Sequence, residues 1–231
     1  HNHHPPPHNQ PHRLKDILLR RASDPVAEVA NKVTLCLAKA IEADRDFGHQ
    51  LALRLHEREE TLVRRAMADV LTRLFRRLTW DALPLLDDML TSDDEGVLAA
   101  ASATVGDVKY LDKEQWADRL RQLADHPLAI VRRNLVPNLR EYIEFDPADS
   151  RGLFHQLWKD GDEVVRTRLR ELMLRMEEVA PDRFAAQVKA LHEVQADLGP
   201  LWEPLALRRA ERSQAWQAWL AGEGEQPSGE E

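Results

Sequence analysis

The strongest constraint on the fold is a fixed interval of 34 residues between apolar positions. Five valines mark this interval: Val29, Val63, Val97, Val131 and Val165. The positions four and eight residues after each valine are also apolar, namely Val33, Met67, Ala101, Leu135 and Leu169, then Leu37, Leu71, Val105, Leu139 and Met173. Offsets of zero, four and eight fall on one face of an α-helix. We therefore predict five copies of one helical unit, and we call these positions the apolar stripe.

A second apolar helix is expected ahead of each valine. Eleven residues before the valines stand Leu18, Ala52, Leu86, Leu120 and Phe154. Capping and helix-breaking residues, such as Asp160 with Gly161, separate the two helices. A helix pair cannot bury its apolar stripe alone, so neighbouring pairs must stack. The predicted fold is all-α, an α-solenoid of about five 34-residue helix pairs with a C-terminal capping pair.

The solenoid is predicted to form a single domain over residues 12–222. A flexible His- and Pro-rich tail is expected at 1–11, and a flexible polar tail at 223–231. The last two helices depart from the interval, as an end cap would. We expect three tryptophans to seal the exposed end of the core: Trp202, Trp216 and Trp219.

Composition narrows the class of protein. Only nine glycines and 6% aromatic residues favour helices over an all-β fold. The formal net charge of −8 argues against a chain built globally for phosphate binding. The single cysteine, Cys36, fits a reducing, cytoplasmic location, and no apolar run is long enough to cross a membrane. Because the chain begins at His1, we expect it to be part of a larger protein or complex.

The helix pairs resemble the HEAT repeat family, in which an Asp near the start of the second helix precedes a Val-Arg pair. Asp160 followed by Val165 and Arg166 has this pattern, and LVRRA at 62–66 and IVRRN at 130–134 share the Val-Arg position. Tetratricopeptide repeats have the same period, but this sequence lacks the Trp, Leu-Gly and Tyr residues that their pattern requires. The resemblance covers about residues 12–180. It implies that the second helices line a concave binding face.

The repeats depart from the HEAT pattern in several places. Arg58, Ser92 and His126 replace the Asp, and Ala30 and Leu98 replace the Arg. The polar ladder that this pair builds between neighbouring repeats should therefore be intermittent.

Candidate binding residues are those opposite the apolar stripe on the second helices. By helical geometry these are Arg65, Arg76, Tyr110, Arg133 and Arg140. Arg132 lies beside the stripe, in the ladder position, and is predicted to be structural. Pro137 should kink its helix, because it removes one backbone hydrogen bond.

The arginines leave two interpretations open: solvated charges that pair between repeats, or an electropositive groove for an acidic partner or nucleic acid. The sequence predicts a non-catalytic binding or scaffolding module for a protein or peptide, with no catalytic residue, cofactor or metal site. The alternative is a nucleic-acid-binding solenoid, at the extreme a DNA glycosylase of the alkylpurine type. Trp80, Trp116 and Trp158 would suit that class, although core packing is the better explanation for Trp116 and Trp158.

Overall fold

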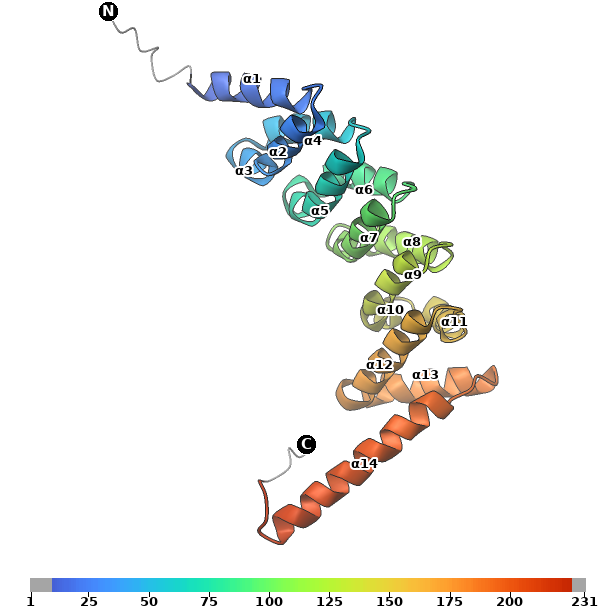
Figure 1. Ribbon diagram of the computed structural model, residues 1–231. Coiled ribbons are helices and arrows are strands. Elements are labelled where there is room, and N and C mark those ends of the chain that lie inside the picture. Colours follow the sequence, from blue (N-terminus) through green and yellow to red (C-terminus); the bar gives the residue numbers. More distant parts are fainter. Residues whose placement is uncertain (1–9, 226–231) are drawn as a thin grey trace, which may run out of the picture. The chain divides into compact units, whose positions relative to one another are not determined.

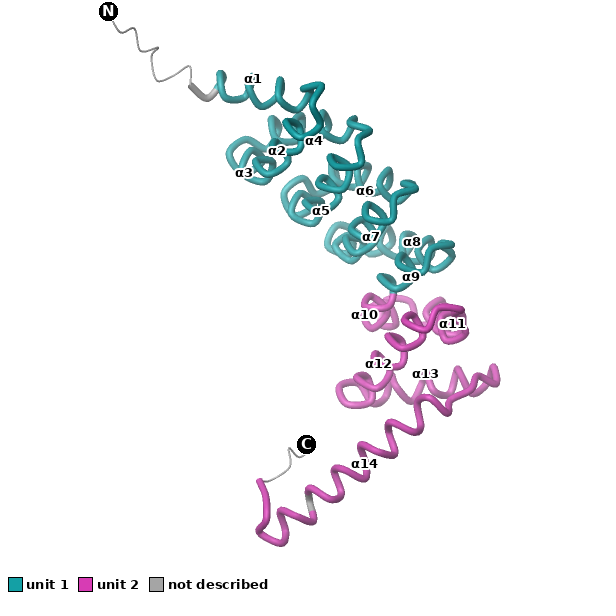
Figure 2. Tube along the Cα trace, viewed as in Figure 1, with its two compact units in different colours: residues 1–135 teal, residues 136–231 magenta. Residues whose placement is uncertain are grey.

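The computed structural model describes residues 10–225, and every regular element in that range is a helix (Figure 1). The predicted all-α fold class is confirmed. The chain divides into two compact units, His1–Leu135 and Val136–Glu231 (Figure 2). The prediction of one domain over residues 12–222 stays a prediction. Most of the two expected tails lies outside the described residues, although α1 already begins at Gln10.

The first unit contains α1 (Gln10–Ala22), α2 (Ala27–Thr34), α3 (Leu37–Ala43), α4 (Arg45–His56), α5 (Thr61–Leu78), η2 (Thr79–Ala82), α6 (Leu83–Met89), α7 (Glu95–Thr104), η3 (Val105–Tyr110), α8 (Lys113–Ala124) and α9 (Ala129–Leu135). The second unit contains η4 (Val136–Asn138), α10 (Leu139–Phe145), α11 (Pro147–Trp158), α12 (Glu163–Val179), α13 (Pro181–Glu193) and α14 (Gly199–Leu220). The η elements are short 3-10 helices.

The helices begin at the interval that the valines mark. The second helices start at Ala27, Thr61, Glu95, Ala129 and Glu163, each 34 residues after the one before. Aspartates fix several of these starts, because a side-chain oxygen accepts a hydrogen bond from a backbone N–H in the first turn. Asp94 accepts from Val97 at 3.0 Å, and Asp162 accepts from Val165 at 3.0 Å. Local sequence therefore sets where each pair turns.

The turn inside each helix pair carries a recurring hydrogen bond. In four of the five pairs, the side chain of the first turn residue accepts a hydrogen bond from the backbone N–H two positions later. These residues are Asp24, Ser92, His126 and Asp160. The Ser92 hydroxyl and the His126 Nδ1 atom thus accept the same bond as the carboxylates of Asp24 and Asp160. Arg58 differs, because its guanidinium donates to the carbonyl oxygens of Ala22 and Asp24 in the previous turn.

The core consists of the apolar stripe and the preceding helix. All stripe positions are buried except Val29, and all positions eleven residues before the valines are buried except Leu18. These two half-buried residues both belong to the first helix pair. In the first unit α2, α5, α7 and α9 pack in that order, and in the second unit α11 packs against α12 and α13.

The helix that contains Pro137 is interrupted, as predicted. α9 ends at Leu135, and a 3-10 turn precedes α10. Two interruptions were not predicted, one between α2 and α3 and one where α7 passes into η3. Within residues 10–225 no helix combines the length and apolarity needed to span a bilayer.

The tryptophans only partly follow the expectation. Trp116 and Trp158 are buried in the core, and the Trp158 Nε1–H donates to the carbonyl of Asp197 at 2.8 Å. The prediction for Trp202 is wrong, because its side chain is 44% exposed; Leu198, Leu201 and Leu205 are buried at this end instead. Trp219 is half-buried. The side chain of Trp216 lies outside the described residues.

Candidate binding surface on the second helices

Arg65 is exposed, as predicted, but it is engaged in an ion pair. Its guanidinium donates to both carboxylate oxygens of Asp94, with Nε at 3.0 Å and Nη2 at 2.8 Å. This hydrogen bond and the one from the Val97 amide lower the pKa of the Asp94 carboxyl to about 2. Arg65 thus joins α5 to the start of α7, which favours a structural role over a ligand contact.

The Val-Arg pairs have a shared structural role. Arg64, Arg132 and Arg166 each donate to the backbone carbonyl six residues earlier, at 3.0, 2.9 and 2.5 Å. Each arginine therefore closes the turn of its own helix pair. Arg132 is structural, as predicted, but these bonds lie within a repeat rather than between repeats.

Other side chains connect neighbouring pairs, and the sequence reasoning missed them. The Arg119 side chain is only 10% exposed, and its guanidinium donates to both oxygens of Asp87 at 2.9 and 2.8 Å. Asn134 donates to the Ser102 hydroxyl at 2.8 Å. Arg119 and Asp87 are 32 residues apart in the sequence, close to the 34-residue interval. Oppositely charged residues at about this separation could have indicated pairing between neighbouring helix pairs.

Arg76 and Tyr110 remain accessible in the first unit. Arg76 is exposed near the end of α5, and Tyr110 is 77% exposed at the end of η3. The Lys109 ammonium lies 5.1 Å from the centre of the Tyr110 ring. Burial raises the pKa of the Asp107 carboxyl, and the positive charges of Arg76 and Lys109 lower it in part. Asp107 therefore lies within electrostatic reach of both cations.

We call these four residues the Arg76–Tyr110 cluster: Arg76, Asp107, Lys109 and Tyr110, which are linked by charge interactions and by the Lys109–Tyr110 contact. The underlying helices are held together by the Thr72 and Thr104 hydroxyls, 2.9 Å apart. The cluster thus rests on packed helices of one unit.

The other two predicted residues belong to later helices. Arg133 is half-buried in α9, and Arg140 is exposed in α10 of the second unit. The convergence of all the predicted arginines on one surface therefore stays a prediction.

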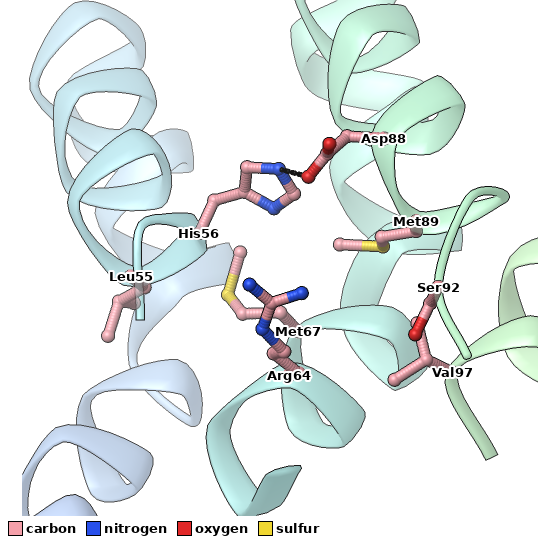
Figure 3. A pocket seen from close by; sticks show the side chains of 8 residues that line it. All are labelled: Leu55, His56, Arg64, Met67, Asp88, Met89, Ser92 and Val97. Atoms are coloured by element: carbon pink, nitrogen blue, oxygen red, sulfur yellow. Dashed lines mark ion pairs between the residues drawn. The ribbon is translucent and has the colours of Figure 1, made fainter. Parts of the chain in front are cut away.

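A separate pocket in the first unit has very little free volume. It lies between the ends of α4 and α6 and the starts of α5 and α7, where the His56 Nε2 atom is 2.7 Å from an Asp88 carboxylate oxygen (Figure 3). The cavity volume is about 10 Å³, room for roughly one water molecule. Within residues 10–225, no three His, Cys, Asp or Glu side chains are grouped as a metal site would require.

Comparison with known proteins adds little about function. No protein-family model matches the sequence, and no curated protein matches it. A crystal structure of an engineered protein from the Northeast Structural Genomics Consortium resembles the chain with a TM-score of 0.52 and 16% sequence identity. The match covers 85% of this chain and 95% of that chain. At such low identity the likeness concerns the fold alone.

Proposed function

We propose that the protein is a HEAT-like α-solenoid that acts as a non-catalytic, cytoplasmic binding module. The constant interval between helix starts and the burial of the apolar stripe support stacked repeats. Stacked helix pairs present long surfaces of side chains, which suit recognition of an extended partner.

The Arg76–Tyr110 cluster is the proposed binding surface, and the exposure of Tyr110 carries this proposal. A tyrosine that is 77% exposed contributes little to the core. Tyrosine and arginine are the side chains that most often dominate binding energy at protein interfaces. Within residues 10–225, Arg76 forms no ion pair, so its charge is available to a partner.

The charges around the cluster favour an acidic protein segment over nucleic acid. Arg65 is already neutralised by Asp94, and the carboxylates of Asp69 and Asp107 interrupt the positive surface. A phosphate backbone requires a run of cations with few acids between them. A peptide can place a carboxylate on Arg76 and an apolar side chain on Tyr110.

The test is fluorescence anisotropy with a labelled peptide rich in Glu and Leu, and in parallel with a short labelled DNA duplex. We expect Arg76→Glu and Tyr110→Ala each to weaken peptide binding about tenfold or more. Arg20→Glu is the matched control, because Arg20 is exposed on α1, away from the cluster, and carries the same charge change. It should bind like the wild type.

Two results would overturn the proposal. Equal peptide affinity of the wild type and Arg76→Glu would remove the cluster as the binding surface. Tight DNA binding with a steep loss of affinity as salt rises would favour the nucleic-acid alternative.

A further inference from the structure

A groove in the second unit lies between α11 and α13, which pack directly against each other. It consists of two adjoining cavities of about 360 and 200 Å³. Both are lined by Arg151 of α11 and by Gln187, Ala190 and Glu193 of α13. The larger cavity alone is within the size range of small-molecule sites.

Two polar atoms at this groove are buried without a hydrogen-bond partner among residues 10–225. One is the Oε1 atom of Gln187, a residue that is only 3% exposed, and the other is the Nε2 atom of His155. Buried polar groups in native proteins nearly always have a partner, and an exception calls for an explanation such as a ligand or an ordered water. A carbonyl oxygen such as Gln187 Oε1 can only accept, so its missing partner must be an N–H or O–H donor.

The walls of the groove carry three cations. Arg151, Arg183 and Lys189 are exposed, and within the described part of the chain none of them forms an ion pair. Arg183 and Glu193 stand ten residues apart on α13, which corresponds to about 15 Å along the helix. The cationic Arg183 and the acceptor Glu193 are therefore well separated along the groove.

We propose that this groove binds a small organic anion that also carries hydroxyl or amino groups. Its phosphate or carboxylate lies against Arg151 and Arg183, because a guanidinium can donate two parallel hydrogen bonds to either group. One of its hydroxyl or amino groups donates to Gln187, and a second faces Glu193. A neutral sugar would leave the cations without a partner, and a bare inorganic anion would leave Gln187 without one.

The inference is tested by isothermal titration of the whole chain with ribose 5-phosphate and with gluconate, which differ in the source of the negative charge. Ribose and inorganic phosphate are the comparison ligands. We expect at least one hydroxylated anion to bind at least tenfold more tightly than both comparison ligands. The better of the two then identifies phosphate or carboxylate as the anionic group.

Three variants locate the binding. The double variant Arg151→Glu and Arg183→Glu should abolish it, and the matched control Arg209→Glu, at an exposed arginine of α14, should not change it. Gln187→Met has nearly the same shape but lacks the acceptor. It should keep the weak binding of inorganic phosphate and lose the preference for the hydroxylated anion. Circular dichroism confirms that each variant is folded.

The inference is overturned if neither hydroxylated anion binds at about 10 mM. It is also overturned if the double variant binds as the wild type does, or if Gln187→Met keeps the full preference. Arg76→Glu, in the other unit, leaves this binding unchanged, so failure here is distinguishable from failure of the peptide-binding proposal.

Discussion

Replacing Gly48 by alanine is predicted to destabilise the protein, although alanine is the better helix former. Gly48 is buried in α4, where α4 crosses α3. A Cβ atom added there would lie 2.5 Å from the Ile41 Cα atom and 2.7 Å from the Ile41 backbone nitrogen. Carbon atoms in contact need about 3.5–4.0 Å, so the two helices would have to separate by roughly 1 Å.

The magnitude follows from two opposing terms. Alanine in a helix interior gains about 1 kcal/mol over glycine. Overpacking a core costs about 1–3 kcal/mol, and the clash here is with backbone, which cannot rotate away. Because a backbone clash places the cost near the upper end of that range, the expected net effect is a loss of about 2 kcal/mol in the free energy of unfolding.

Urea denaturation followed by circular dichroism measures this loss. Gly152→Ala in α11 is the matched control, because a Cβ atom there would meet nothing within 4 Å. That variant should be stabilised by about 0.5–1 kcal/mol. A Gly48→Ala variant at least as stable as the wild type would refute the packing of α3 against α4.

Three further predictions concern charge, an unpaired polar atom and burial. Asp94→Asn should lower stability above pH 4 but have no effect below pH 2. The folded-state pKa of Asp94 is lowered from 3.8 to about 2, so the stability that its charge contributes is lost as pH falls through that range. Urea titrations between pH 2 and 5 measure the difference between variant and wild type, and a pH-independent difference would contradict the Arg65 ion pair. Gln187→Met should raise the free energy of unfolding of the ligand-free protein by about 1 kcal/mol, because it removes an unpaired buried acceptor, and a destabilised variant would show that Oε1 is satisfied. Trp116→Ala should lower the free energy of unfolding by about 3–5 kcal/mol, whereas Trp80→Ala, at a residue 51% exposed, should change it by less than about 0.5 kcal/mol. Thermal melts measure both variants, and equal losses of stability would contradict the assigned core.

The sequence predicted the helices well because the determining interactions are local. A helix start depends on a capping side chain within three residues, as with Asp94 and Val97. Burial of the stripe follows from helical periodicity. Val29 is only half-buried because its helix pair is the first and has a neighbouring pair on one side only. The interruption at Pro137 follows from its missing N–H group.

The candidate site was less predictable because its residues are selected by contacts between repeats. Helical geometry correctly placed Arg65 opposite the stripe, but it could not show that Asp94, 29 residues later, pairs with it. Trp202 was expected to seal the end of the core, whereas leucines are buried where α14 packs against α12. The groove beside Gln187 has no sequence signature, since it depends on two buried atoms that find no partner.

The most direct test of the central claim is chemical-shift mapping of the backbone amides during titration with the acidic Glu- and Leu-rich peptide. Binding to the Arg76–Tyr110 cluster should concentrate the shift changes at the end of α5 and in η3, at residues 73–78 and 105–110. The Arg76→Glu variant should lose these changes at the same peptide concentration. Shift changes confined to α1 or to the second unit, with η3 unaffected, would contradict the account.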